Sequence, residues 1–199
     1  CMGIDKRDGL GIDEDEDIGR AGQADALYLV ALDTKTGKTD IIAISRDIYS
    51  DIGVYSADGV YTGTKKAQLC LAFAYGDGKE TSCNNTVSAI ERLFYNLPVN
   101  SYFAMDWQAI GELNDAIGGV YVTLEDDYMY HTGYYGRAGD TVRLDGDYAR
   151  AYLQYRDVTQ LNSSVDRMNR QINYLEKFTE KVKNEHFFAF MKKELRFFR

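Results

Sequence analysis

The chain has 199 residues, of which 23 are Lys or Arg and 31 are Asp or Glu, so its formal net charge is −8. This acidic balance and the lack of a long basic stripe exclude a general nucleic-acid binder, because contacts to phosphate backbones need concentrated Lys and Arg. The 45% hydrophobic content, with 16 Tyr and 9 Phe, excludes a disordered segment and suffices for the core of one domain. No run of residues approaches the roughly 20 apolar side chains that cross a bilayer.

A short strand-like segment at the N-terminus ends at Asp5. Further along the chain, residues 13–17 are five successive acidic residues. Such a run cannot form a core strand, so we predict a loop. Its D-x-D-x-D start is that of an EF-hand, but Gly19 comes one position late and the twelfth residue is Ala24 rather than Glu. A solvated acidic loop is therefore the better interpretation than a calcium site.

Two continuous apolar runs, 26–32 and 40–45, flank a polar segment with Asp, Thr, Gly and Lys, which predicts two buried strands joined by a hairpin turn. The later elements alternate between helical and strand periodicity, which indicates an α/β sandwich. We expect strands at 101–105 and 120–124, a Tyr/Gly-rich loop at 128–141, and helices at 84–95, 107–117, 146–155 and 165–183. The tail, 186–199, continues as a helix whose apolar face packs on the domain, with membrane-surface contact as the alternative.

The three cysteines, Cys1, Cys70 and Cys83, lack the CxxC spacing of a zinc site, and the two histidines, His131 and His186, are far apart in the sequence. Cys70 and Cys83 could form a disulfide or remain as two buried thiols. The residues alone leave both open, and only an extracellular setting favours the bridge.

Two aspartates flank neighbouring predicted strands. Asp5 follows the first strand and Asp25 precedes the second, so both carboxylates can meet at one edge of the sheet. Such a pair suits Mg²⁺ or Mn²⁺, which take oxygen ligands and keep positions for water and phosphate oxygens. Because Asp also flanks strands as a cap or turn residue, the pair alone is a weak signal.

Several basic or amide side chains occupy positions that suit phosphate binding. Arg46-Asp47 directly follows a predicted strand, where open α/β sheets usually bind ligands, and Arg156 ends a predicted helix. Arg167 and Gln171 are spaced i and i+4, so they share one helix face. Arginine holds phosphate oxygens bidentately. The alternatives are a surface Arg–Asp pair and solvated helix charges.

No competing nucleophile or nucleotide motif is present. The chain contains no G-x-S-x-G, no P-loop and no G-x-G-x-x-G that opens a helix, and its two histidines leave little for a catalytic triad.

Read together, nine short segments in this order and spacing resemble the LytR-CpsA-Psr family over roughly residues 3–175. The segments are Gly3-Ile4-Asp5-Lys6-Arg7, Gln23-Ala24-Asp25 with the following Leu27-Tyr28-Leu29-Val30, Ile42-Ala43-Ile44-Ser45-Arg46-Asp47, Ala72-Phe73-Ala74-Tyr75-Gly76, Asn114-Asp115-Ala116-Ile117-Gly118-Gly119-Val120, Leu144-Asp145-Gly146, Ala149 to Tyr152, Tyr155-Arg156-Asp157, and Asp166-Arg167-Met168-Asn169-Arg170-Gln171.

The resemblance implies a bacterial phosphotransferase that moves an anionic glycopolymer, such as teichoic acid or capsule, from a polyprenyl-pyrophosphate carrier onto peptidoglycan. It implies an extracytoplasmic location, with membrane attachment through an N-terminal anchor that has been trimmed from this chain. The implied fold is a three-layer α/β/α sandwich around a mixed central sheet, with an apolar pocket for the prenyl chain. We expect a single catalytic domain over 1–199, in which 176–199 is a helical extension.

Carried over residue by residue, the resemblance makes Asp5 and Asp25 ligands of Mg²⁺, or of Mn²⁺, bound with the pyrophosphate. The expected catalytic and pyrophosphate contacts are Arg46, Arg156, Arg167 and Gln171. Arg7 and Asp47 are expected to support substrate binding. Asp47 and Asp166 are candidate general bases, between which the sequence does not decide.

Two positions depart from the family pattern. Gln23 stands two residues before Asp25 and Gln154 two before Arg156, where the family has arginines, so two cationic contacts are missing; Arg20 is a candidate substitute for one. The implied extracytoplasmic location favours the Cys70–Cys83 disulfide. Two alternative activities stay open: a polyprenyl-pyrophosphate hydrolase that uses water, and a non-catalytic regulator that binds lipid phosphates.

Overall fold

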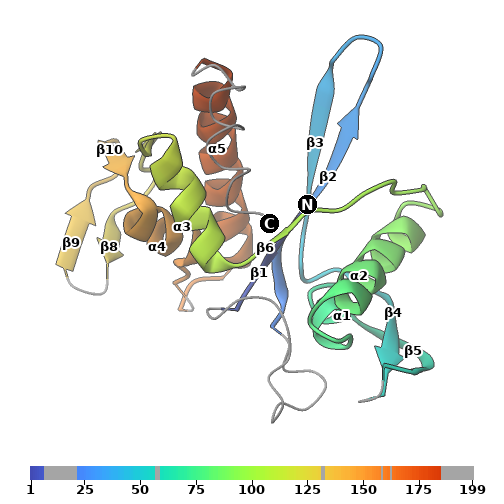
Figure 1. Ribbon diagram of the computed structural model, residues 1–199. Coiled ribbons are helices and arrows are strands. Elements are labelled where there is room, and N and C mark those ends of the chain that lie inside the picture. The colour runs from blue at the N-terminus through green and yellow to red at the C-terminus, as the bar shows by residue number, and fades with distance from the viewer. Residues whose placement is uncertain (7–21, 57–58, 131–132, 158, 162, 185–199) are drawn as a thin grey trace. The chain divides into compact units, whose positions relative to one another are not determined.

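The computed structural model describes residues 1–6, 22–56, 59–130, 133–157, 159–161 and 163–184 (Figure 1). The chain divides into two compact units, Cys1–Gln108 and Ala109–Arg199. Within the described ranges, none of the helices has the length and apolar character needed to cross a membrane.

The first unit is built on a four-stranded mixed sheet with the order β3-β2-β1-β6. Its strands are β1 (Met2–Ile4), β2 (Ala24–Leu32), β3 (Thr39–Ile44) and β6 (Ala104–Met105). β1 pairs with β2 antiparallel and with β6 parallel, and β2 pairs with β3 antiparallel. The expected α/β class with a mixed central sheet is therefore confirmed.

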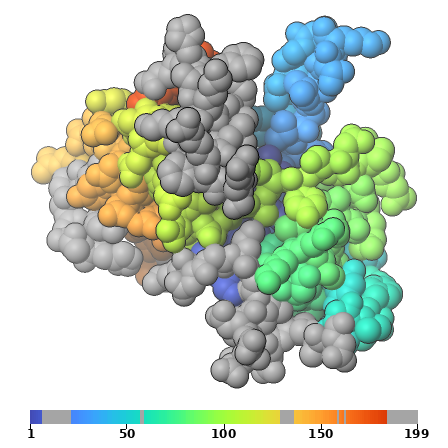
Figure 2. Space-filling view, viewed as in Figure 1, coloured from blue at the N-terminus to red at the C-terminus, as the bar shows by residue number. Residues whose placement is uncertain are grey.

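The predicted hairpin is β2 with β3, and its turn is closed by Asp33, whose carboxylate accepts hydrogen bonds from the Lys35 amide at 2.8 Å and the Thr36 hydroxyl at 2.7 Å. Its outer half projects from the rest of its unit (Figures 1 and 2). Both strands were expected to be buried, which is wrong for this half, where Leu32 is 60% exposed and Ile41 is 43% exposed. The three residues of β1 are too few to pair with the full length of β2.

A second layer of the first unit consists of the ribbon β4 (Tyr49–Tyr55) with β5 (Tyr61–Gln68) and the helices α1 (Leu71–Ala74) and α2 (Glu80–Leu93). Asn85 of α2 is buried and joins three segments: its amide group exchanges two 2.9 Å hydrogen bonds with the backbone of Gly53 and donates to the Ala72 carbonyl at 2.7 Å. α2 begins four residues before the predicted start. Apolar side chains from all these elements form one core, including Ile4, Leu27, Ile44, Ile52, Leu69, Phe73, Ala89 and Ile90.

The second unit takes most of α3 (Trp107–Ala116), then β7 (Val120–Thr123), β8 (Tyr128–Tyr130), β9 (Gly133–Gly136), β10 (Thr141–Leu144), α4 (Gly146–Gln154) and α5 (Ser163–Asn184). β7 pairs antiparallel with β10. The loop predicted for 128–141 is wrong, because β8 and β9 form a hairpin there. The positive φ angles of Gly118 and Gly119, +75° and +81°, end α3 at the predicted place.

A buried polar chain ties α3 to both β10 and α5 in the second unit. Tyr174 donates to the side-chain oxygen of Asn114 at 3.0 Å, and Asn114 donates to the Leu144 carbonyl at 3.0 Å. Asp145 caps α4 by accepting from the Tyr148 amide at 3.1 Å. α5 runs through the first part of the expected extension to Asn184, and the tail 186–199 lies outside the described residues.

Candidate functional site

A β-bulge determines where Asp25 lies. Ile4 of β1 pairs with Ala24 and Gly3 pairs with Ala26, so Asp25 is the extra residue of β2 at this point. The Asp5 amide donates to the Gln23 carbonyl at 2.8 Å, which keeps the two strands paired beyond the end of β1. Bulges re-aim side chains and are frequent beside active sites. Asp5 directly follows β1, as predicted, whereas Asp25 was expected to precede the second strand and instead lies within β2, at the bulge where β2 pairs with β1. The two residues are thus at the same end of two adjacent strands.

Arg46, which follows β3, is held against the same edge. Its guanidinium forms an ion pair with the carboxylate of Asp25 and donates to Gln23 Oε1 at 2.9 Å. Its Nε lies 3.7 Å from Asp47 Oδ1. The side chains of Arg46 and Asp25 are only 19% and 8% exposed, so this pair is largely shielded. The alternative, a surface pair of Arg46 with Asp47, describes only the second contact, in which the Asp47 side chain is 39% exposed.

The Arg46 Nε is buried and has no hydrogen-bond acceptor among the described residues. A buried N–H without an acceptor costs roughly 1–3 kcal/mol of stability and calls for an explanation such as an anion that completes the site. The phosphate oxygens of a substrate are acceptors of the right charge.

Gln23 is the position where the family pattern has arginine. In this chain its amide oxygen accepts from Arg46 at 2.9 Å, which an arginine could not do because a guanidinium has no acceptor. The exchange of arginine for Gln23 therefore removes one cation from the site and adds an amide that orients the guanidinium of Arg46.

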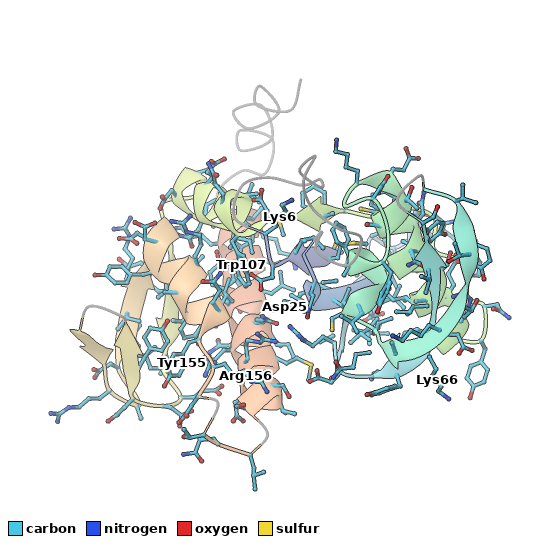
Figure 3. All side chains as sticks on the ribbon, turned by 90° about the horizontal axis from the view of Figure 1, so that it is seen from below. Lys6, Asp25, Lys66, Trp107, Tyr155 and Arg156 are labelled. Carbon is cyan, nitrogen blue, oxygen red and sulfur yellow. The ribbon has the colours of Figure 1, made fainter. Side chains whose placement is uncertain are left out.

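Trp107 also belongs to this site, although the sequence analysis did not identify it. The indole Nε1 donates to Asp5 Oδ1 at 2.9 Å from the first residue of α3. Figure 3 labels Trp107 together with Asp25 and Lys6. The sequence signal that could have revealed it is its position: it starts a predicted helix immediately after a predicted strand.

The predicted disulfide between Cys70 and Cys83 is not formed: both are free, buried thiols, and the exposed Cys1 is free as well. Each buried thiol has a neighbour of its own. The Cys70 thiol lies beside the Arg46 guanidinium, and burial raises its pKa. Burial raises the pKa of Cys83 to about 11, and its thiol is hydrogen bonded to Tyr102. Of the two alternatives, the structure therefore shows two buried thiols at Cys70 and Cys83.

The remaining predicted cationic residues lie in the second unit, around the connection from α4 to α5. Arg156 Nε donates to Ser163 Oγ at 3.0 Å, and Gln171 Nε2 donates to the Leu153 carbonyl at 3.3 Å. Arg167 and Gln171 are 7% and 5% exposed, so solvated helix charges, the alternative, are excluded for both. Buried cationic and amide groups within one turn of each other on α5 suit an anionic ligand.

Arg170, between these two residues, is anchored within the protein. Its guanidinium donates to the Tyr155 carbonyl and lies over the Tyr155 ring, with its central carbon 5.1 Å from the ring centroid. Arg170 therefore fastens the residue before Arg156 to α5, and we assign it no ligand contact.

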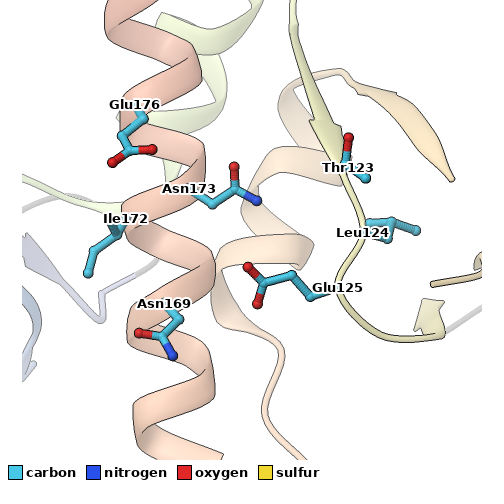
Figure 4. Close-up of a pocket in the computed structure, with 7 residues that line it drawn as sticks. All are labelled: Thr123, Leu124, Glu125, Asn169, Ile172, Asn173 and Glu176. Atoms are coloured by element: carbon cyan, nitrogen blue, oxygen red, sulfur yellow. The ribbon is translucent and has the colours of Figure 1, made fainter. Parts of the chain in front are cut away.

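A groove of about 490 Å³ opens elsewhere on the second unit (Figure 4). Its described lining residues are Thr123, Leu124, Glu125, Asn169, Ile172, Asn173 and Glu176, two of which are acidic and none basic. This composition does not suit a pyrophosphate, and only Leu124 and Ile172 are aliphatic. The groove is therefore not the expected pyrophosphate site.

The chemistry of Asp5 and Asp25 fits a magnesium ion. The described residues contain no cluster of three or more His, Cys, Asp or Glu side chains that could hold a metal. Mg²⁺ does not need one, because it is usually bound by one or two carboxylates together with waters and substrate phosphates. Of the other predicted residues, Arg7, Arg20, the acidic loop 13–17, His131 and His186 lie outside the described residues.

Comparison with known proteins gives a consistent result. The LytR_cpsA_psr family model matches residues 1–195. The polyisoprenyl-teichoic acid–peptidoglycan teichoic acid transferase TagU of Bacillus licheniformis is 26% identical over 183 residues, covering 92% of this chain and 51% of that protein. The chain spans about half the length of the curated relatives it matches.

Solved structures show the same fold. Protein gbs0355 from Streptococcus agalactiae superposes with a TM-score of 0.74 at 23% identity, covering 96% of this chain and 62% of that one. The structure of TagT bound to LI-WTA superposes with a TM-score of 0.64 at 23% identity, covering 92% of this chain and 63% of that one.

Proposed function

The chain belongs to the LytR_cpsA_psr family, and we propose that it is a phosphotransferase that moves a teichoic acid or similar anionic glycopolymer from a polyprenyl-pyrophosphate carrier onto peptidoglycan. The TagU relatives are named polyisoprenyl-teichoic acid–peptidoglycan teichoic acid transferases, and the structural neighbour TagT was solved bound to LI-WTA. The observation that carries the proposal concerns Arg46. Its shielded guanidinium pairs with Asp25, and its Nε has no hydrogen-bond acceptor among the described residues.

We assign the donor's pyrophosphate to the predicted cationic set. Arg46 would contact it through Nε and through the two terminal guanidinium nitrogens, which donate to Asp25 and Gln23 in this structure. Arg156, Arg167 and Gln171 provide the contacts of the second unit, and Arg7 and Asp47 support binding. Guanidiniums that are already oriented stabilise charge that develops during phosphoryl transfer without reorganising at that moment.

Asp5 and Asp25 would hold Mg²⁺, or Mn²⁺, in this proposal. The ion would supply charge neutralisation for the pyrophosphate. The ion pair with Arg46 and the bulge of β2 keep the Asp25 carboxylate at the edge of the sheet, and Trp107 does the same for Asp5.

The proposed reaction breaks the phosphoanhydride bond of the donor and forms a phosphodiester bond to the acceptor. A sugar hydroxyl of the acceptor attacks the glycan-linked phosphorus and forms a new P–O bond, while the bond from that phosphorus to the bridging oxygen breaks. Polyprenyl phosphate leaves with the bridging oxygen, and the hydroxyl proton passes to a base, for which Asp47 and Asp166 are the candidates. The prenyl chain needs an apolar pocket, and the reaction takes place on the extracytoplasmic face of a bacterial membrane, to which the protein is anchored.

The test is a transfer assay with purified protein, a lipid-linked teichoic acid donor, peptidoglycan and Mg²⁺. We expect polymer attached to peptidoglycan with wild-type protein and a loss of at least 100-fold with Arg46→Ala. A matched control is Arg92→Ala, because Arg92 is an exposed residue of the same unit that donates to the Asp51 carbonyl and is assigned no ligand contact.

The same assay distinguishes the other activities. Release of free polymer phosphate at an equal rate without peptidoglycan would identify a hydrolase. Binding of the donor without either product would identify a lipid-phosphate-binding regulator, and would overturn the proposed transfer.

A further inference from the structure

Two parallel strands place Trp107 beside Asp5. Met2 pairs with Ala104 and Gly3 pairs with Met105 in the parallel ladder of β1 and β6. Asp5 follows Gly3 by two residues, and Trp107 follows Met105 by two. The pairing register therefore brings the two side chains to the same edge of the sheet, although they are 102 positions apart in the sequence.

The two partners differ in burial. Trp107 is 5% exposed, so packing fixes the position of its indole, whereas Asp5 is an exposed residue. The indole nitrogen is a donor only. Its hydrogen bond of 2.9 Å to Oδ1, together with the bond from the Asp5 amide to Gln23, restrains the carboxylate. Within the described part of the chain, the Trp107 bond occupies Oδ1 and leaves Oδ2 for a ligand.

We propose that Trp107 is a positioning residue for Asp5, which it orients so that Oδ2 faces the divalent cation of the proposed function. This inference rests on that function and deepens it. Groups that orient metal ligands reduce the freedom the ligand must lose on binding, and their removal typically weakens metal binding by about 10–100-fold.

Trp107 is also the single tryptophan of the chain. Its fluorescence therefore reports on its own surroundings without contribution from another indole. A cation bound to Asp5 changes the charge within one hydrogen bond of the ring, so we expect metal binding to alter the emission.

The first measurement is a titration of wild-type protein with Mg²⁺ and with Mn²⁺, each alone and in the presence of inorganic pyrophosphate, followed by tryptophan emission. We expect a saturable change in the wild type and a loss of that change in Asp5→Asn, which keeps Trp107. An emission change of equal size and midpoint in Asp5→Asn would contradict metal binding at Asp5.

The second measurement compares Mn²⁺ affinity by electron paramagnetic resonance for three proteins. Trp107→Phe keeps an aromatic ring but removes the N–H donor together with the second ring of the indole, and we expect affinity about 10–100-fold weaker. Phe73→Leu, in the buried core of the same unit, is the control for general loosening, and we expect unchanged affinity. Circular dichroism verifies that each variant is folded.

The outcomes separate this inference from the proposed function. Wild-type affinity in folded Trp107→Phe would overturn the positioning role and leave the proposed transferase intact. Equal weakening in Trp107→Phe and Phe73→Leu would also overturn it, because the effect would then be one of packing. Absence of Mn²⁺ binding by the wild type, with or without pyrophosphate, would reject the metal site and the role of Trp107, while the polymer-transfer assay would still decide the reaction.

Discussion

The guanidinium of Arg46 is paired with the carboxylate of Asp25, so a predicted phosphate contact and a predicted metal ligand are each other's partners. The pair shows how the proposed cation site and the proposed anion site could both lie at this end of the strands. In the proposed function, pyrophosphate would replace Asp25 as the partner of Arg46, and Asp25 would then be available to hold the cation.

Asp25→Asn should both weaken the fold and abolish transfer. The amide keeps the shape but not the charge, so the guanidinium of Arg46 loses the closer and more buried of its two carboxylate partners and, among the described carboxylates, keeps only the longer contact to Asp47. We expect a decrease of about 1–3 kcal/mol in the free energy of unfolding, measured with urea, and loss of Mg²⁺-dependent transfer. Asp40→Asn is the control, because the side chains of the Lys38–Asp40 pair are 72% and 60% exposed. Wild-type turnover in Asp25→Asn would remove Asp25 from the metal site.

Gln23→Arg restores the family pattern but removes the acceptor for Arg46. We expect tighter binding of polyprenyl pyrophosphate, because a second guanidinium faces the anion, and lower stability in its absence, because two like charges are brought together. Donor binding and thermal unfolding measured on the same preparation test both expectations. Gln23→Glu, which keeps the acceptor, should show the reverse pattern. Identical behaviour of the two variants would contradict the role assigned to Gln23.

Arg167→Ala should weaken binding of a polyprenyl-pyrophosphate lipid by about 1.5–3 kcal/mol, the typical value of one hydrogen bond to a charged group. Isothermal titration calorimetry with a short-chain lipid measures the effect. Arg150→Ala is the matched control on α4, where Arg150 forms an ion pair with Asp147 near the surface. Unchanged affinity in folded Arg167→Ala would assign Arg167 a structural role only.

The cysteines should react according to their burial. We expect one fast-reacting thiol, Cys1, in native protein at pH 8 and three after unfolding, because Cys70 and Cys83 are buried and burial raises the pKa of each above its ordinary value. Labelling with a maleimide followed by mass spectrometry counts the thiols. A mass two units lower without reductant, with Cys70 and Cys83 unreactive after unfolding, would instead identify the disulfide.

Stability should fall at alkaline pH. Burial raises the pKa of Cys83 from 9.0 to about 11, and that of Tyr28 and of Tyr152 from 10.0 to about 12. The folded state therefore retains these protons while the unfolded chain loses them, so stability is complete below pH 9 and decreases as the pH rises from 9 to 12. Urea unfolding at pH 8, 9.5 and 10.5 measures the loss. Tyr152→Phe, which removes one of these protons, should reduce the slope at the alkaline end.

Local sequence determined the order of most helices and strands, because apolar periodicity and the glycines that end helices depend on only a few neighbouring residues. It also determined the family, through short motifs in a particular order. The acidic and basic residues of those motifs could be named from the sequence, since their types alone restrict the chemistry. The β8–β9 hairpin was missed because its strands are three and four residues long and are rich in Tyr and Gly.

Tertiary structure decided how those residues are partnered. The bulge at Asp25, the bond of Gln23 to Arg46 and the bond of Trp107 to Asp5 all depend on strand register, which joins positions up to 102 residues apart. The two buried thiols likewise follow from packing rather than from spacing. A sequence motif specifies which groups are available, whereas the pairing of strands and the burial of side chains determine which of them meet.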